Sequence, residues 1–255
     1  MTVPRVAYFY WSGGPLPWIC AQSVATFRRH HPVWRVVLGS PELEVAPEGV
    51  ELERDEVTDP SLPAHKRSDV WRWWTLQRGG WYSDTDVVYL RSVDSLLVGD
   101  HDAWVTTDGG HVLPNAKRGW RWDARHRTKK LVQDGLSIGA MAAKEGSELA
   151  RRCAESASAA RICPVYDYQS HGTSMLVPQW AKLTAGLSIG PLPFSALYSG
   201  STDSDVAEIW REGSRPDPRA VGIHWYYGSP ESRPFHSARG VEDLPDCAVR
   251  SAILS

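Results

Sequence analysis

Two aspartates, Asp84 and Asp86, are the residues of this sequence whose type and spacing most directly suggest chemistry. One residue separates them in a segment with extended character, Trp81–Leu90, which is interrupted at Asp84–Asp86, and both side chains are expected on the same side of the backbone. Two carboxylates roughly 5 Å apart repel each other by about 3 kcal/mol at an effective dielectric constant of about 20. A hard divalent ion such as Mg²⁺ or Mn²⁺ relieves this repulsion and keeps positions open for phosphates. The pattern favours a metal site, and an ordinary surface pair is the alternative.

Asp69 and Arg72 lie three residues apart in a predicted helix, Ala64–Arg78, and therefore share one face of it. A guanidinium suits a phosphate, and a carboxylate can accept a hydrogen bond from a ribose hydroxyl. The alternative for this pair is a surface salt bridge worth about a few tenths of a kcal/mol. Gly79–Gly80 is typical of a helix end and leads directly into the segment that carries the aspartates.

Strands and helices alternate in the N-terminal half. Val6–Trp11 is rich in β-branched and aromatic residues, which predicts a strand, and the glycines that follow predict a turn. Pro17 suits the first turn of a helix that ends before Pro32, and Trp34–Gly39 predicts a second strand. This spacing indicates a right-handed crossover in an α/β sheet. Further strands are expected at Val50–Leu52, Ala103–Thr107, Ser137–Ala143 and Ala220–Trp225. Further helices are expected at Ser147–Ala160 and between Gly172 and Leu183. The tail from Ser195 is expected to be rich in loops.

The bulk composition fits one globular domain. The chain has 255 residues, of which 42% are hydrophobic and 23% are charged, and a net charge of -2 that indicates no particular partner. Four scattered cysteines without metal-like spacing are expected to be reduced and partly buried. No apolar run approaches the roughly 18 residues that span a bilayer, and no leader is recognised, so we expect a cytoplasmic protein.

Basic residues concentrate in one block, Lys117–Lys130, which holds seven Lys or Arg and one Asp and so carries a local charge of +6. We expect a loop or short helix there, beside the edge of the active site. A solvated face is one interpretation of it. The other is a surface for a polyanionic acceptor, in which the basic residues meet phosphates and Trp120 and Trp122 stack on bases or sugars.

The segment Lys66–Val87 resembles the S-D-x-x-R … G-G-x-Y-x-D-x-D block of DXD-containing glycosyltransferases with the GT-A fold, which include toxin-like and mannosyl- or capsule-type sugar transferases. Phe9–Pro17 is similar to the opening strand of that family, and Ile223–Ser229 is similar to its C-terminal H-x-W … S element. Gly172-Thr-Ser is a looser match to a helix start of the family. The resemblance is strong over residues 65–91 and thin over residues 95–220.

The resemblance implies a GT-A-like, Rossmann-like domain over residues 1–255, with a mixed, mostly parallel sheet flanked by helices. The nucleotide-sugar half would span about residues 1–110 and the acceptor half about residues 111–255. It implies a nucleoside-diphosphate sugar as donor, a UDP-sugar being favoured, and Mn²⁺ or Mg²⁺ as metal. For the donor, the resemblance implies that Trp11 stacks on the nucleobase, Ser68 binds the donor, Asp69 binds the ribose, and Arg72 and Tyr82 contact the diphosphate or sugar. For the metal, it implies that Asp86 coordinates the ion and that Asp84 contacts both the ion and the ribose or sugar. His224 and Ser229 would lie near the metal or diphosphate. Asp134 is the one candidate for an acidic residue that the family has near Gly135.

For catalysis, the resemblance implies a retaining transferase in which Asp86 and Arg72 serve the departing diphosphate, while the leaving phosphate accepts the proton of the acceptor. The acceptor would be a hydroxyl of a glycan, or of a hydroxylated base in DNA. Two other classes stay open. One is a non-catalytic module on the same fold that binds glycan or nucleic acid. The other is a serine hydrolase, since Gly135–Gly139 and Gly186–Gly190 each match G-x-S-x-G.

Overall fold

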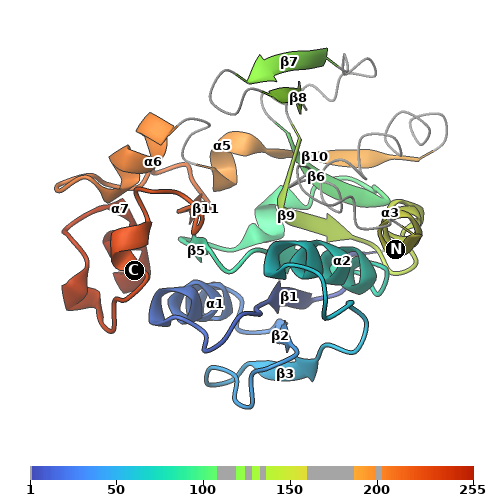
Figure 1. Cartoon of the computed structure of the whole chain (residues 1–255), viewed down its shortest axis with the longest axis horizontal. Coiled ribbons are helices and arrows are strands. Elements are labelled where there is room, and N and C mark those ends of the chain that lie inside the picture. The colour runs from blue at the N-terminus through green and yellow to red at the C-terminus, as the bar shows by residue number, and fades with distance from the viewer. Residues whose placement is uncertain (1, 108–118, 124–127, 133–135, 160–186, 199–202) are drawn as a thin grey trace.

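A seven-stranded sheet forms the centre of the protein, in the strand order β10-β6-β9-β4-β1-β2-β3 (Figure 1). This computed structural model describes residues 2–107, 119–123, 128–132, 136–159, 187–198 and 203–255. Within the sheet, β9 runs antiparallel to its neighbours β4 and β6, and the other neighbouring strands are parallel. The predicted mixed, mostly parallel α/β sheet is confirmed. Its strands are β1 (Val6–Tyr10), β2 (Arg35–Ser40), β3 (Glu51–Arg54), β4 (Gly80–Ser83), β6 (Ala103–Thr107), β9 (Leu136–Ala143) and β10 (Ile189–Pro193).

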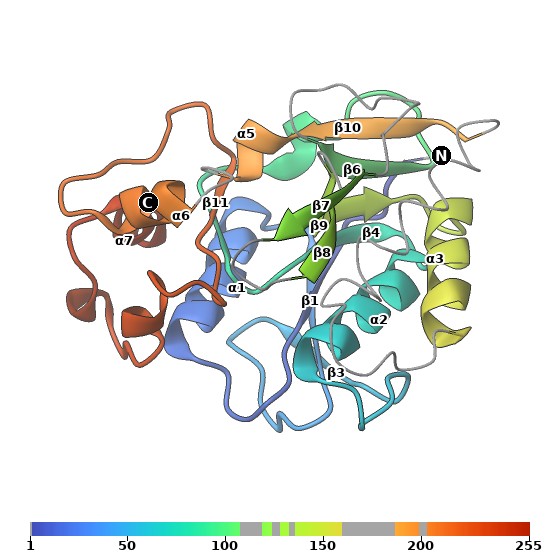
Figure 2. The same ribbon diagram turned by 45° about the horizontal axis from the view of Figure 1, so that its top comes forward.

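Helices cover both faces of this sheet (Figure 2). The side chains of β1 alternate between these two faces. Tyr8 and Tyr10 belong to the same buried cluster as residues of α2 (Ala64–Leu76) and α3 (Glu148–Ala159). Ala7 and Phe9 point the other way, and Phe9 packs edge-to-face on Phe27 of α1 (Trp18–His30) with 5.6 Å between the ring centroids. Because neighbouring strand residues face opposite sides, one buried strand supplies both cores.

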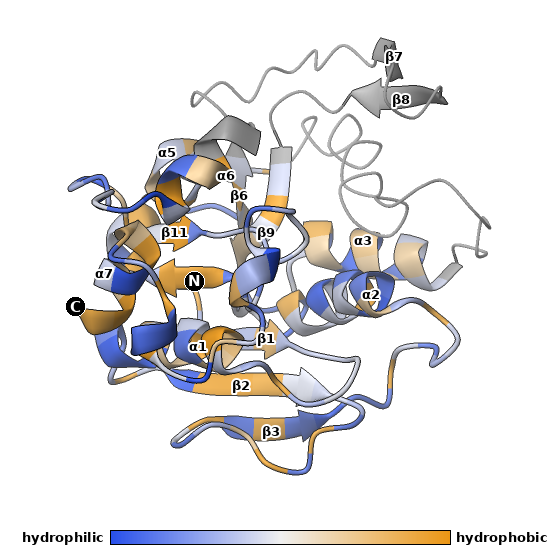
Figure 3. Cartoon of the chain, turned by 60° about the vertical axis from the view of Figure 1, so that its left-hand side comes forward, coloured by the Kyte–Doolittle hydropathy of each residue, from blue (hydrophilic) through white to orange (hydrophobic). Residues whose placement is uncertain are grey.

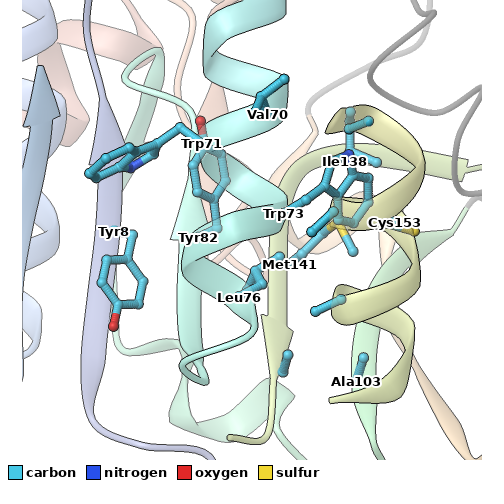
Figure 4. Packing of buried hydrophobic residues seen from close by; sticks show 14 of the residues in the cluster. Tyr8, Val70, Trp71, Trp73, Leu76, Tyr82, Ala103, Ile138, Met141 and Cys153 are labelled. Carbon is cyan, nitrogen blue, oxygen red and sulfur yellow. The ribbon is translucent and has the colours of Figure 1, made fainter. Parts of the chain in front are cut away.

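Helix α2 is fixed by two tryptophans that point to opposite sides of it, as Figure 4 shows. Trp71 extends toward β1, where its ring lies 5.6 Å from that of Tyr10, and Trp73 extends toward Cys153 of α3. Both indoles are fully buried. Truncating a buried tryptophan to alanine typically costs about 3–5 kcal/mol. The two indoles therefore hold α2, and the polar residues on it, in a fixed place over the sheet.

The turn after α2 depends on Gly79. Its φ angle is +73°, and a Cβ at this residue would lie 2.5 Å from the backbone nitrogen of Glu145. Glycine therefore avoids both a backbone penalty and a clash. Through this turn the chain enters β4 directly and reaches Asp84 one residue after the strand ends.

Two expectations about secondary structure are corrected, and one strand was missed. Strand β10 was not predicted, because Pro191 and Pro193 argue against a strand; it lies at the edge of the sheet, where prolines are tolerated. In the basic block, the described residues form an antiparallel pair, β7 (Gly119–Asp123) and β8 (Thr128–Val132), in place of the expected loop or short helix. The alternation of Trp120 and Trp122 with charged residues is too short to predict a strand.

The tail contains more helix than the loop-rich segment that we expected. Helices α5 (Phe194–Leu197), α6 (Asp203–Trp210) and α7 (Ala248–Leu254) pack around β11 (Gly222–His224), which pairs antiparallel with β5 (Val87–Tyr89). The 3₁₀ turns are η1 (Val93–Leu96), η3 (Arg233–Phe235) and η4 (Val241–Asp243). Figure 3 shows α7 with apolar residues on part of its surface, and Val249 and Ile253 of α7 are buried. So short an apolar pattern gave no helix signal in the sequence.

The remaining predicted elements agree with the structure to within two residues at each end. The helix expected between Gly172 and Leu183 lies outside the described residues. Cys20, Cys153 and Cys247 are buried free thiols, as expected. Among the helices that the structure describes, none is both long enough and apolar enough to cross a membrane.

Candidate active site

Asp84 and Asp86 lie in a turn between β4 and β5, at the interruption that we predicted in the extended segment Trp81–Leu90. Two segments hold this turn: the Asp84 backbone N–H donates to the carbonyl of Gly139 on β9 (2.7 Å), and the N–H of Trp225, directly after β11, donates to the carbonyl of Asp86 (2.9 Å). Pairing of β11 with β5 places His224 opposite Val87. As a result, one ligand atom from each of Asp84, Asp86 and His224 falls within 4.8 Å of the others.

Asp86 is bound by the segment that follows β11. Its Oδ1 lies 2.9 Å from Nε2 of His224, and its Oδ2 accepts a hydrogen bond from the Tyr227 backbone N–H at 2.7 Å. Burial favours the neutral form of the carboxyl, but His224 and the Tyr227 N–H outweigh it and lower the pKa of Asp86. Burial likewise works against a charged imidazole, yet the Asp86 carboxylate raises the pKa of His224. The two groups therefore favour each other's charged forms.

Asp84 faces the other side of the cluster, toward helix α2. Nη2 of Arg72 donates to its Oδ1 at 2.7 Å, and Nη1 of the same guanidinium donates to Asp69. Burial raises the pKa of Asp84, and Arg72 opposes that shift. Burial also raises the pKa of Asp69 to about 6, against the same opposing effect of Arg72. The pair Asp69 and Arg72 is thus a buried bridge to Asp84 rather than an exposed surface pair.

Tyr82 packs against the guanidinium of Arg72, and Ser68 contacts the hydroxyl of Tyr82. The guanidinium carbon of Arg72 lies 4.5 Å from the centroid of the fully buried Tyr82 ring, and the Tyr82 hydroxyl lies 2.8 Å from Oγ of Ser68. A cation over an aromatic face gains about 0.5–2 kcal/mol, more when both are out of water. These contacts fix the direction of the guanidinium.

Trp11 stands at the end of β1, next to the cluster. Its ring contacts that of Tyr227 edge-to-face at 5.4 Å, and its Nε1 donates to the carbonyl of Gly14 at 3.0 Å. The loop that holds it is fixed in turn by Glu42, whose Oε2 accepts the backbone N–H of Gly13 at 2.7 Å and of Gly14 at 3.3 Å. Trp11 is partly buried, so part of its indole is open to solvent.

Sequence reasoning missed the residues around the His224 ring. The ring stacks on Tyr226 at 4.0 Å and meets the edge of Tyr198 at 4.9 Å. Tyr226 has a φ angle of 54°, an unusual conformation for an aromatic residue. Gly139 leaves open the space that a Cβ would occupy 2.9 Å from Oδ2 of Asp84. A pattern of one glycine and two isolated tyrosines carries no chemical signal before the fold brings them together.

The donor set of the cluster fits a divalent cation. With His224 neutral, three carboxylates and one guanidinium leave the site with two negative charges, and two carboxylates with an imidazole are ligands that Mn²⁺ and Mg²⁺ accept. Within the described part of the chain, Nδ1 of His224 and Nε of Arg72 are buried and have no hydrogen-bond partner. An unpaired buried polar group costs about 1–3 kcal/mol, so both atoms are suited to a bound ligand.

One predicted site residue, Ser229, lies apart from this cluster. Oγ of Ser229 donates to Oγ of Ser232 at 3.0 Å, which makes it part of a local turn. Asp134 lies outside the described residues. The hydrolase alternative is wrong in its geometry: Ser137 lies within β9, and Ser188 directly precedes β10, whereas a nucleophile elbow joins a strand to a helix.

Two solved glycosyltransferases share this fold. The glycosyltransferase GlyE of Streptococcus pneumoniae has 11% identity to the chain and a TM-score of 0.54, and the match covers 99% of this chain and 60% of that one. A glycosyltransferase involved in the glycosylation of the major capsid of PBCV-1 has 10% identity and a TM-score of 0.50, and the match covers 90% of this chain and 97% of that one. These neighbours define the fold as that of GT-A glycosyltransferases. No curated protein matches the sequence.

The family match falls on the segment that builds the site. Residues 17–103 match the family described as "Glycosyltransferase sugar-binding region containing DXD motif". This segment carries Asp69, Arg72, Asp84 and Asp86. Over this segment the chain is therefore similar to the DXD-containing glycosyltransferases.

Proposed function

We propose that the protein transfers a hexose from a nucleoside-diphosphate sugar, a UDP-sugar being favoured, to a hydroxyl acceptor with retention of configuration. Asp84, Asp86 and His224 would hold a Mn²⁺ or Mg²⁺ ion. The observation that carries the proposal is the convergence of these three side chains, within 4.8 Å, beside the buried guanidinium of Arg72. When bound, such an ion neutralises negative charge on the diphosphate.

The residues around the cluster have distinct tasks in this proposal. The hydrogen bond from Arg72 favours the ionised form of Asp84 and fixes the orientation of its carboxylate. The unpaired Nε–H of Arg72 is a donor available to the departing diphosphate. Asp69 anchors the opposite side of the guanidinium, and its carboxylate accepts a ribose hydroxyl. Because the three groups are already held in place, little reorganisation is needed when the substrate binds.

The nucleoside of the donor would lie near the end of β1. Trp11 stands there at the end of the strand, partly open, and Tyr227 connects it to Asp86. Indole faces stack well on nucleobases. This arrangement supports a donor whose base lies on Trp11 and whose diphosphate lies at the Asp84–Asp86 turn.

The experiment is a ligand screen followed by one substitution. UDP-sugars and GDP-sugars are tested for Mn²⁺-dependent thermal stabilisation of the protein, since a ligand present at 100 times its Kd adds about 2.7 kcal/mol to the stability. The best donor is then assayed for metal-dependent hydrolysis and transfer. Asp86→Asn should remove both the stabilisation and the turnover, while Asp94→Asn, on exposed η1, should leave both unchanged. Turnover by Asp86→Asn at saturating metal would contradict the proposal.

The acceptor is a second part of the proposal. The basic block Lys117–Lys130 would bind a polyanionic acceptor, such as an anionic glycan or DNA with a hydroxylated base. Support comes from its seven basic residues and from the β7–β8 pairing, which places Arg121 opposite Lys130. A steep loss of acceptor binding between 50 and 200 mM salt, roughly 10³-fold for six or more phosphate contacts, is expected. Acceptor binding that does not depend on salt would contradict this role of Lys117–Lys130.

A further inference from the structure

Helix α2 carries three buried basic residues, and one of them has no partner. Arg67 donates to Oγ1 of Thr58 at 3.1 Å and lies 3.5 Å from the carboxylate of Asp55, and Arg72 is bound by the two carboxylates described above. Lys66 is only 6% exposed, yet its ammonium group forms no hydrogen bond or ion pair with any residue that the structure describes. A buried charge is normally paired, so this ammonium group is available to an anion from outside the protein.

The N-terminal end of α2, where Lys66 is the third residue, adds positive potential. The helix has 13 residues, Pro63 precedes it, no side chain caps it, and its first turn contains no acidic residue. The dipole of a helix places about half a positive charge at this end. Because the Cα–Cβ bonds of a helix tilt toward its N-terminus, the side chain of Lys66 leads toward the same end. The ammonium group and the helix end therefore attract an anion at one place.

Asp69 does not neutralise Lys66, although it lies three positions further along and shares a face of α2 with it. The carboxylate of Asp69 is bound to Arg72. Burial raises the pKa of Asp69 to about 6, Arg72 is the main opposing effect, and the charge of Lys66 adds a smaller one. Lys66 therefore acts on this carboxylate only at longer range.

The position of Lys66 connects it to the active site. Along the helix it precedes Asp69 by about 4.5 Å, since each residue of an α-helix advances the axis by about 1.5 Å. Asp69 in turn belongs to the bridge that leads through Arg72 to Asp84. An anion held at the beginning of α2 is therefore a neighbour of the active-site cluster, and a ligand that occupies the cluster can carry it.

We propose that Lys66 and the N-terminal end of α2 bind an oxyanion, a phosphate or carboxylate group of a ligand that occupies the active site. A helix end beside an ammonium group suits such a ligand, since the helix dipole and the charge act in the same direction. This place is distinct from the Asp84–Asp86 turn, where the carboxylates repel an anion unless a metal ion is bound. The anion belongs either to the sugar of the donor or to the acceptor. The inference goes beyond the proposed function, because inorganic phosphate alone tests it.

Inorganic phosphate is the probe in the first experiment, without divalent metal and without nucleotide sugar. Thermal unfolding at increasing phosphate concentration and constant ionic strength measures the Kd. The wild type should show a saturable rise in Tm, and Lys66→Met should weaken phosphate binding at least about tenfold, which corresponds to about 1.4 kcal/mol. Lys66→Arg keeps the positive charge and should retain most of the binding. A wild type without a saturable phosphate effect would overturn the inference.

Lys144→Met is the matched control, because the ammonium group of Lys144 is already paired with Asp100. Phosphate also stabilises proteins by its exclusion from their surface, and this general effect is common to all variants. Lys144→Met should therefore keep the saturable response of the wild type. Equal phosphate responses of Lys66→Met and Lys144→Met would show that Lys66 does not bind the anion.

Stability without ligand separates a binding role of Lys66 from a structural one. Methionine replaces a buried charge that has no partner by an apolar group of similar length, so Lys66→Met should unfold at the same or a higher urea concentration than the wild type. Lys66→Gln, which keeps a polar group, answers the same question if the methionine variant does not fold. A variant that unfolds at a clearly lower urea concentration and still binds phosphate normally would make the lysine structural, and the inference would be wrong.

The second experiment identifies the molecule that carries the anion. Calorimetry with Mn²⁺ compares a UDP-hexose with the matching UDP-hexuronate, which has a carboxylate on its sugar. If the donor carries the anion, Lys66→Met should weaken the hexuronate and leave the hexose unchanged. If the variant binds both as the wild type does, while phosphate binding is lost, the anion belongs to the acceptor. A wild type that binds neither nucleotide sugar contradicts the proposed function and leaves the phosphate result valid.

Discussion

The Nη2 atom of Arg72 lies 2.7 Å from Oδ1 of Asp84, and this hydrogen bond joins helix α2 to the turn between β4 and β5. The same guanidinium is held by Asp69 on its own helix and lies over the ring of Tyr82. Only 2% of Arg72 is exposed, so its positive charge interacts with neighbouring groups of the protein even when no substrate is bound. The position of the Asp-x-Asp turn therefore depends on a residue twelve positions earlier in the chain.

Arg72→Met should destabilise the protein by about 3 kcal/mol, because it leaves the buried Asp69 carboxylate and the partly buried Asp84 carboxylate without their partner. Arg72→Lys should lose less stability but lower kcat/KM by roughly 100-fold, since an ammonium group cannot hold both carboxylates in the fork geometry. Urea unfolding and donor turnover measure the two effects. Arg35→Met is the control: Arg35 forms an exposed ion pair with Glu51, so its loss should cost no more than about 1 kcal/mol. Equal activity of Arg72→Lys and wild type would contradict the prediction.

Gly139→Ala should weaken both Mn²⁺ binding and nucleotide-sugar binding while the fold is kept. The added methyl group would lie 2.9 Å from Oδ2 of Asp84 and 3.6 Å from Cε1 of His224, too close for the carboxylate to stay in place. Metal-dependent thermal stabilisation measures the effect, and circular dichroism checks the fold. Ile138→Val is the control on the same strand, because it removes one core methylene at a cost of about 0.5–1.5 kcal/mol without entering the site. Normal metal binding by Gly139→Ala would show that this space is not part of the site.

Glu42→Ala should raise the KM for the donor about fivefold and leave kcat unchanged. The carboxylate holds the Gly13–Gly14 loop by accepting two backbone N–H groups, and that loop fixes the Trp11 indole through the Gly14 carbonyl. A loss of about 1 kcal/mol of ordering corresponds to that factor. Glu44→Ala, an exposed substitution two residues further along, is the control. A fall in kcat with unchanged KM would place Glu42 in the chemistry instead of in donor binding.

The sequence was sufficient for the elements that carry strong local patterns. Helix α2, with Gly79–Gly80 at its end, and the apolar strands β1 and β6 were predicted because their periodicity and end signals agree. The cluster of Asp84, Asp86 and His224 was expected from resemblance, since no local rule brings His224 across 138 positions to Asp86. Pairing of β5 with β11 does that, and strand partners are a property of the whole fold.

The rest of the site depends on tertiary contacts that no local pattern encodes. Gly139 was noticed only as part of a G-x-S-x-G match, and its importance lies in the absence of a side chain beside Asp84 and Tyr198. Strand β10 was missed because the effect of proline in a strand depends on whether that strand lies at the edge of the sheet.

His31 provides a prediction about stability that does not involve the site. The Val93 backbone N–H donates to its Nε2 at 2.8 Å, so the neutral ring carries its hydrogen on Nδ1, 2.6 Å from the carbonyl of Phe27. Burial lowers the pKa of His31, and protonation would remove the acceptor that Val93 needs. Between the folded pKa and the ordinary value of about 6.5, the unfolded chain binds more protons than the folded one. The contribution of His31 to the free energy of unfolding should therefore be constant above about pH 6.5. It should fall as the pH drops below about 6.5 and level off below the pKa of His31 in the folded protein.

Urea unfolding at several pH values between 7.5 and 5 measures this dependence. Burial also lowers the pKa of His30 and His236, so the informative quantity is the difference between the wild type and His31→Gln. Glutamine keeps a polar group at this place but does not titrate, so the loss of stability on acidification should be smaller in the variant. Parallel pH profiles for the two proteins would show that His31 is protonated equally easily in the folded and unfolded chain, and the link between helix α1 and η1 through its ring would then be wrong.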